Sequence, residues 1–495
     1  MIKRKNLYIF GMALLCLMVA YLPFVQMHFS SDSYANVRGI DTTVHLVNGR
    51  LVTYVVQSIF NAFGLSVIKY QSVITCVFIC VLGISITLFY GEISKYLGKN
   101  IRARIMVFIG SLYIYINAFF AEWFLYVESL TSTSVGIVFL TIAIVLASQS
   151  VDTRHIACSF LLLLAVLNMY QLYVEFFLIL SLSIVYVKYC GQLNRKSFFH
   201  SLVIVCEAGV ASIITILSQP LIAQVFGVFV SDRAATFELG KIADNTASII
   251  ASQKSIWGKA YGLLPDGVLV VFAILLLTAF LINKLICQRD INGFIYAVLI
   301  IISGLVITFA PHIIASVVWM APRTIPGVFH ILTFLVIANG IQSMGNNCDK
   351  YLKSTVIAAA CILLVLNAYA SNGILSNNVA TNRIDRTYAM QINSKIEEYE
   401  AESGIEVYRI ATVNDVSPTY SYGGIKYVTH DMNIRGLVVS WGDVNLINYY
   451  CNENYEKVSM PDEIYNTYFE GKNWDLFDLN EQAVFVGDTL YIAMY

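Results

Sequence analysis

The 495-residue sequence predicts a polytopic α-helical membrane protein with about eleven transmembrane helices, followed by a small C-terminal α/β domain. Three observations support this prediction: the composition, the distribution of charge along the chain, and the spacing of apolar runs. Hydrophobic residues make up 58% of the chain and charged residues only 13%, whereas soluble domains carry about 25% charged residues. So little polar surface cannot cover a globule in water, and lipid is therefore the expected solvent for most of the chain.

The charge changes sign late in the chain. Residues 1–370 contain 23 Lys and Arg against 14 Asp and Glu, whereas residues 371–495 contain 8 against 18. Such a change predicts a boundary between a membrane domain (1–370) and an acidic domain (371–495). In the acidic domain, helical periodicity over 388–402 and alternation over 405–413 and 484–494 predict a helix and strands. Because this domain is negatively charged, it is not expected to bind nucleic acid electrostatically.

Apolar runs and basic loops together predict the topology. A helix needs about twenty apolar residues to cross the hydrocarbon core, and short cytoplasmic loops are rich in Lys and Arg. Placing the basic clusters inside leaves the N-terminus cytoplasmic and the C-terminal domain extracytoplasmic. The apolar segment 51–68 would break this parity, so it is predicted as an interfacial or re-entrant helix. The predicted spans are 7–27, 70–90, 105–121, 130–148, 156–170, 171–187, 198–218, 266–284, 291–310, 327–345 and 355–371, and the outer loops are 28–69, 219–265 and 311–326.

The first outer loop contains two candidate functional residues. Asp32 follows the first span directly, so its carboxylate is partly desolvated and could act as a general base towards a hydroxyl. The loop continues through Asp41 and His45 to Gly49-Arg50, and the planar guanidinium of an arginine suits a phosphate group. The alternative interpretation is that these are solvated loop charges.

Further polar candidates lie at the outer ends of later spans. Glu122 and Glu128 flank Trp123, and Gln171 follows Tyr170 at a junction between two spans. Ionisable groups near the membrane are costly and usually face a polar cavity. Arg323 belongs to a proline-rich outer turn, where it could bind a lipid phosphate or serve as an ordinary interfacial anchor.

Several catalytic signatures do not occur in the sequence. It contains no Walker A motif, no GxGxxG opening a helix, no HExxH and no GxSxG. It also lacks a DxD motif in a soluble domain of the kind that a nucleotide-sugar transferase would use. A sugar donor would therefore have to be presented in or at the membrane, and no metal site is predicted.

Short motifs spread over residues 20–345 resemble the bacterial serotype-converting O-antigen glucosyltransferases of the Gtr type, within the wider GT-C class. The first loop of that family has an Asp-Asp-Tyr element followed by Gly-Arg, here Asp32-Ser33-Tyr34 and Gly49-Arg50. Ser33 replaces the second Asp, which puts a mechanism with two adjacent carboxylates in doubt. The other matching motifs are Asn117-Ala118-Phe119-Phe120 with Glu122, where the family has Pro after Asn, Tyr170-Gln171, and Pro322-Arg323.

The resemblance implies a GT-C-like hexosyltransferase in the bacterial plasma membrane. Its donor would be a polyprenyl-phosphate hexose, such as undecaprenyl-phosphate glucose, and its acceptor a lipid-linked or surface glycan. Asp32 would be the catalytic base of an inverting displacement, and a flippase and a donor-synthesising enzyme would be partners. No cofactor is implied, and the need for a divalent metal stays open. Together, the loop charges and the resemblance predict these substrate-binding residues: Tyr34, Asp41, Arg50, Glu122, Gln171 and Arg323.

Two other functions are compatible with a multi-span envelope protein. An O-antigen polymerase or ligase would carry several arginines in a large late outer loop, but the loop 219–265 has only Arg233. A lipid-linked sugar flippase or transporter would be expected to show internal repeats, and none is visible in the sequence. Both features favour the transferase.

Overall fold

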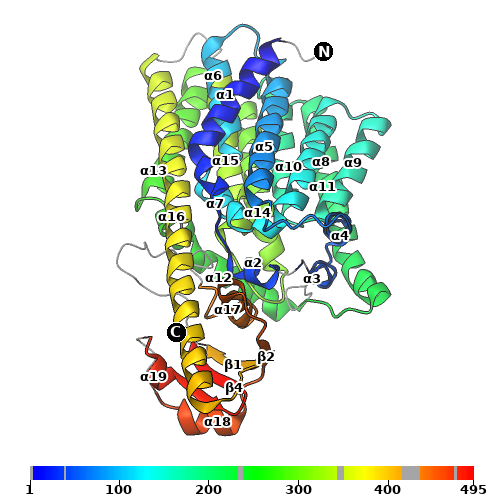
Figure 1. Ribbon diagram of the computed structural model, residues 1–495. Helices are drawn as coiled ribbons and strands as arrows, with labels where there is room; N and C mark the ends of the chain where they lie inside the picture. Colours follow the sequence, from blue (N-terminus) through cyan, green and yellow to red (C-terminus); the bar gives the residue numbers. More distant parts are fainter. Residues whose placement is uncertain are drawn as a thin grey trace.

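The computed structural model describes residues 4–37, 39, 41–231, 238–342, 350–414, 435–472 and 477–494. These residues form a helical bundle with a small sheet-containing tail at one end (Figure 1). Each predicted span contains one main helix. The bundle helices are α1 (Arg4–Tyr21), α2 (Ser31–Ala35), α3 (Thr43–Val47), α4 (Leu51–Ala62), α5 (Gln71–Ser94), α6 (Ile101–Tyr113), α7 (Ala118–Ala121), α8 (Leu130–Gln149), α9 (Thr153–Leu167), α10 (Tyr173–Lys188), α11 (Arg195–Phe226), α12 (Leu239–Gln253), α13 (Val268–Leu281), α14 (Ile291–Ile313), α15 (Gly327–Gln342) and α16 (Lys350–Ser403).

Within the described residues, eight helices are long and apolar enough to cross a membrane. This finding confirms the prediction of a polytopic membrane protein, whereas the count of eleven spans stays a prediction. Two short helices, α9 and α10, occupy the region 156–187, as expected. The segment 51–68 contains only the twelve-residue helix α4, which is too short to span the hydrocarbon core.

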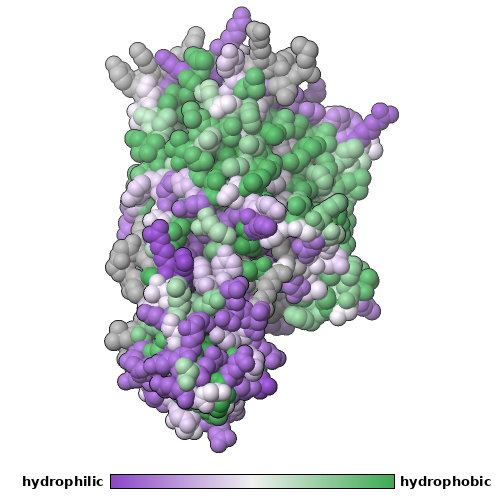
Figure 2. All heavy atoms as spheres, in the orientation of Figure 1, coloured by the Kyte–Doolittle hydropathy of each residue, from purple (hydrophilic) through white to green (hydrophobic). Residues whose placement is uncertain are grey.

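Helix α10 lies at the centre of the bundle. Its residues Tyr173–Val187 are all buried, and it packs against α8, α11, α14 and α15. A helix that is apolar on every side is expected to be surrounded by protein or lipid. The peripheral helices instead expose apolar side chains, and Figure 2 shows a hydrophobic band across the face of the bundle that is in view.

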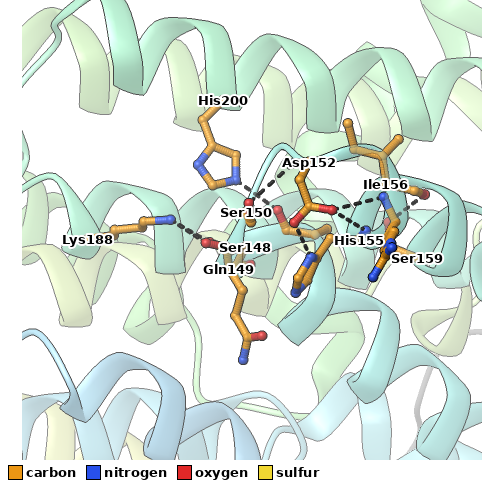
Figure 3. Close-up of polar contacts among 11 residues, drawn as sticks. Ser148, Gln149, Ser150, Asp152, His155, Ile156, Ser159, Lys188 and His200 are labelled. Carbon is orange, nitrogen blue, oxygen red and sulfur yellow. Dashed lines mark hydrogen bonds and ion pairs between the residues drawn. The ribbon is translucent and has the colours of Figure 1, made fainter.

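Local capping residues define the helix ends on the side of the bundle away from the tail. Asp152 begins α9 by accepting hydrogen bonds from the backbone N–H groups of Arg154 (2.9 Å) and His155 (3.3 Å). Lys188 donates to the carbonyl groups of Ser148 (3.3 Å) and Gln149 (2.7 Å) at the last turn of α8 (Figure 3). These contacts pair backbone groups that have no partner inside the helices.

Helix α16 connects the bundle to the tail without interruption. With 54 residues it is about 80 Å long, far more than the roughly 30 Å of a hydrocarbon core. The predicted domain boundary at 370/371 therefore lies inside a continuous helix. The acidic tail is therefore joined to the membrane part by the helix α16 itself, not by a loop.

The tail contains a four-stranded sheet in the order β2-β1-β4-β3. Strand β1 is parallel to both of its neighbours, with Arg409 opposite Thr489, whereas β3 and β4 form an antiparallel hairpin. The single strand predicted over 484–494 is thus two strands, because the chain turns at Gly487, whose φ of 60° suits glycine. The tail elements are β1 (Arg409–Asn414), α17 (Asp443–Cys451), β2 (Glu456–Val458), α18 (Asp462–Tyr468), α19 (Leu479–Gln482), β3 (Ala483–Val486) and β4 (Thr489–Met494).

The tail has its own hydrophobic core, and the first loop of the bundle contributes to it. Phe29 and Tyr34 pack with Ile392 of α16, Leu446 of α17 and Ile492 of β4. Hydrophilic residues dominate the tail surface in Figure 2. The tail therefore packs directly on the segment that carries Asp32.

Candidate active site

Asp32 lies in the first turn of α2, a helix of one and a half turns. Ser30 caps this helix, and its side chain and that of Ser33 each accept a hydrogen bond from the other's backbone N–H. A carboxylate is favoured at this position because it meets the positive end of the helix dipole. The indole N–H of Trp441, in the tail, donates to Asp32 Oδ1 over 3.0 Å.

A second carboxyl group, that of Glu128, lies beside Asp32. Glu128 Oε2 accepts a hydrogen bond from Ser33 Oγ (2.9 Å), and Oε1 accepts one from Ser30 Oγ (3.5 Å). The carboxyl groups of Glu128 and Asp32 are close enough to interact electrostatically. Ser33 replaces the second acid of the Gtr-type motif, and its hydroxyl here contacts a carboxyl group contributed from 95 residues away.

Arg323 is held by groups on three sides. Its backbone N–H donates to Glu122 Oε2 (2.6 Å), and its guanidinium forms an ion pair with Glu122 Oε1. The guanidinium carbon also lies 4.2 Å from the ring centroid of Tyr126 and 4.4 Å from that of Trp319. The Trp123 indole N–H donates a hydrogen bond to the backbone carbonyl of Arg323 (3.0 Å). Glu122 is fully buried, where an unpaired charge would be costly. The ion pair with Arg323 compensates that charge.

A cavity of about 240 Å³ opens next to this pair. Arg50 and Gln171 line its polar side, and the guanidinium carbon of Arg50 lies 4.7 Å from the ring centroid of Tyr170. Apolar side chains from α9, α11 and α14 form much of the remaining wall. They include Leu167, Ile216, Ile307 and Ala310.

The local structure explains why glycine precedes Arg50. Gly49 has a φ of 67°, and a side chain there would meet the Gln219 side chain of α11 at 2.4 Å. Glycine thus lets the loop approach α11 and turns Arg50 into the cavity. Gln171 supports the same loop by donating to the Asn48 carbonyl (3.1 Å).

His45 does not compete with Arg50 as a cation. Burial, together with the nearby Arg50 charge, lowers the pKa of His45 to about 3. The imidazole is therefore neutral at physiological pH, and Arg50 supplies the positive charge at this side of the cavity.

The structure brings four of the predicted site residues into two pairs. Arg50 and Gln171 line the cavity. Buried Glu122 and partly buried Arg323 form the ion pair behind Trp319, which also lines the cavity. Asp32 belongs to the neighbouring cluster with Glu128. The segment from Glu122 to Glu128 connects the two, because it contributes a residue to each.

Two predicted substrate-binding residues lie elsewhere. The Tyr34 ring is buried in the tail core, stacks on Phe29 and shares a hydrogen bond with the Tyr450 hydroxyl (3.0 Å). Asp41 accepts hydrogen bonds from the backbone and side chain of Thr43 (2.9 and 2.6 Å) at the exposed start of α3. Neither residue lines the cavity, and their described contacts are structural.

The sequence indicated Glu128 as an acid at the outer end of a span but did not select it as a substrate-binding or catalytic residue, and Trp441 was not considered. Glu128 offered a signal, an acidic residue directly before an apolar span, but nothing in the sequence connects it to Ser33. Trp441 offered none, because an isolated Trp in a polar tail is common. In the described ranges, no group of three or more His, Cys, Asp or Glu side chains is arranged to bind a metal ion.

Comparison with known proteins places the chain in a family. No curated protein and no solved structure matches the chain. A family model described as glucosyl transferase GtrII matches residues 21–339, which include α2, the cavity and the Glu122–Arg323 pair. This match covers well over half of the chain, so the protein belongs to the GtrII glucosyl transferase family and is a membrane glycosyltransferase.

Proposed function

We propose that the protein transfers a hexosyl group, glucose according to its family, from a polyprenyl-phosphate donor to a glycan acceptor. The reaction would occur at the outer face of the bacterial plasma membrane, with inversion at the anomeric carbon. The observation that supports this most is the cavity, which combines Arg50 with apolar walls. A lipid phosphate has the same two properties, an anionic group attached to an apolar chain.

The proposed reaction is a single displacement. A hydroxyl oxygen of the acceptor attacks the anomeric carbon while Asp32 removes the hydroxyl proton. The bond between the anomeric carbon and the phosphate oxygen breaks, and the polyprenyl phosphate leaves with the electron pair. Arg50 stabilises the leaving phosphate. Arg323 is less suited to this role because its charge is already paired with Glu122.

The arrangement of the site also supports an outer-face reaction. The tail, α2 and α3 gather at one end of the bundle (Figure 1), and the charge distribution predicts that this end faces away from the cytoplasm. Glu128 would act as a positioning residue, because its hydrogen bonds to Ser30 and Ser33 orient the helix that carries Asp32. Family membership favours this function over the polymerase and flippase alternatives.

The test is transfer of radiolabelled glucose from a synthetic polyprenyl-phosphate glucose to cell-envelope glycan by the purified protein. We expect Asp32→Asn to lower turnover by ~100-fold or more, the usual contribution of a general base. Glu128→Gln is the matched comparison, since it removes the neighbouring acid but retains an oxygen that can accept from Ser33. It should keep turnover within about tenfold of the wild type.

The wild-type protein and the two variants together distinguish three outcomes. A large loss in Asp32→Asn alone supports the proposed base. A large loss in Glu128→Gln with an active Asp32→Asn would make Glu128 the base instead. If the wild-type protein transfers no sugar from any polyprenyl-phosphate hexose, the proposed donor is wrong.

A further inference from the structure

Trp441 contacts the proposed catalytic base from the other end of the sequence. Its indole N–H donates to Asp32 Oδ1 over 3.0 Å, although the two residues are separated by 409 positions. The Trp441 side chain is nevertheless 52% exposed. Among the described tryptophans, Trp441 is the most exposed, although Asp32 fixes its N–H group.

The loop that carries Trp441 is fixed on the tail side. Asp443, two residues later, is buried and accepts hydrogen bonds from Lys457 Nζ (2.7 Å to each oxygen) and Thr412 Oγ1 (2.6 Å). Lys457 also donates to the Ser440 carbonyl, so one cation fixes the residues on both sides of Trp441. The ring is therefore presented in one orientation without a ligand.

The same loop also fits closely against the bundle. A side chain at Gly442 would lie 3.1 Å from the Ser31 carbonyl oxygen, next to Asp32, and 3.0 Å from the Gly436 carbonyl oxygen. A side chain at Gly436 would meet the Tyr34 ring at 2.7 Å. Glycine at both positions lets the tail backbone approach α2, so the distance between Trp441 and Asp32 depends on two close backbone contacts.

A rigid, exposed indole beside a carboxylate matches the chemistry of a sugar ring. The C–H face of a pyranose is apolar and can cover an aromatic face, while its hydroxyl groups need polar partners at the edge. The Asp32 carboxylate supplies such a partner. A phosphate or an acidic peptide would fit less well, because the nearest charged group is an acid.

We propose that Trp441 is the binding platform for the acceptor glycan, so that the tail selects the acceptor of the reaction. The acceptor pyranose stacks on the indole face, and its attacking hydroxyl points at the Asp32 carboxylate, which the indole N–H orients. This assignment rests on the proposed function for the role of Asp32. It places donor and acceptor on different parts of the chain, with the donor in the bundle cavity and the acceptor on the tail.

The first test measures binding without turnover, through the intrinsic fluorescence of the full-length protein. The probes are methyl glycosides of glucose, galactose, mannose, rhamnose and N-acetylglucosamine. We expect at least one to produce a saturable fluorescence change in the wild-type protein and in Asp32→Asn. Trp441→Phe should lose that change, whereas Trp257→Phe should retain it, because the Trp257 indole donates to Gln253 within α12 and its continuation. A change that persists in Trp441→Phe, or no change with any probe, would overturn the proposal.

The second test separates the platform from the N–H group by steady-state transfer. Trp441→Ala should raise the KM for the acceptor glycan by about tenfold and leave the KM for the donor unchanged. Trp441→Phe, which keeps a ring but lacks the donor, should affect kcat more than the acceptor KM and should unfold at the wild-type temperature. An unchanged acceptor KM in Trp441→Ala, with glucose transfer intact, would refute the platform but leave the proposed function standing. If the probes bind through Trp441 but the protein transfers no sugar, the platform stands and the proposed function is refuted.

Discussion

The two ends of helix α8 carry similar kinds of side chain but organise them differently. At its start, Glu128 contacts Ser33 of the first loop, and its carbonyl accepts from Gln57 of α4 (2.7 Å). At its end, about 30 Å away, Asp152 and Lys188 bind backbone groups of the α8 and α9 termini (Figure 3). The first group joins segments that are distant in the sequence, whereas the second completes helix ends.

The difference shows that charged residues near a membrane do not by themselves mark an active site. Both ends contain a carboxylate, a cation and an aromatic neighbour. Among the described residues, the Glu128 end combines them with the first loop, which packs on the tail, and nearby Glu122 belongs to the ion pair behind the cavity. Convergence of sequence-distant groups on open space is therefore the better criterion, and variants at the two ends can test it.

The largest difference is expected between two ion pairs. Arg323→Met leaves the fully buried Glu122 carboxylate without its partner, which should destabilise the protein by about 3–5 kcal/mol. Lys95→Met is the comparison at the other end. Lys95 is 55% exposed, and the buried Glu92 carboxylate that it leaves keeps a hydrogen bond from Gln149 Nε2 (3.0 Å), so this change should cost about 1–2 kcal/mol. Chemical unfolding in detergent measures both, and equal losses would contradict the comparison.

A smaller effect is expected from two cations that each lie over a tyrosine ring. Arg50→Ala should raise the KM for the polyprenyl-phosphate donor by about tenfold or more, because a charged hydrogen bond to phosphate is lost. Arg50→Lys should recover part of the loss, since lysine keeps the charge without the planar fork of donors. Lys188→Ala removes the equivalent cation over Tyr189 and should leave the donor KM unchanged. A similar increase in both alanine variants would mean that the cavity is not the donor site.

The sequence predicted the parts of this comparison that depend on local pattern. Apolar run length located the helices, whereas the assignment of inner and outer loops from the basic clusters stays a prediction. The candidates Arg50, Gln171, Glu122 and Arg323 could be selected because each is polar at the end of an apolar segment, where burial is costly unless a partner is present. All four lie at or directly behind the cavity.

Long-range contacts could not be predicted in this way. The hydrogen bond from Trp441 to Asp32 and that from Ser33 to Glu128 depend on how the tail and the first loop pack. Periodicity carries no information about such pairs. The hairpin at Gly487 could have been predicted. Gly487-Asp488 between apolar residues is a turn signal, but the alternation over 484–494 suggested a single strand.

The smallest effect is expected from Asp152, the N-cap of α9. Asp152→Ala should lower the unfolding temperature by about 1–2 °C through loss of the cap, whereas Asp152→Asn should retain it, and neither should change glucose transfer. The backbone hydrogen bond from His155 lowers the pKa of the Asp152 carboxylate, so the charged cap stabilises the fold at neutral pH. Its contribution is lost as the pH falls through that lowered value, and the difference between wild type and Asp152→Ala should shrink in acid. A tenfold loss of transfer in Asp152→Ala would instead show that the two ends of α8 are coupled in function.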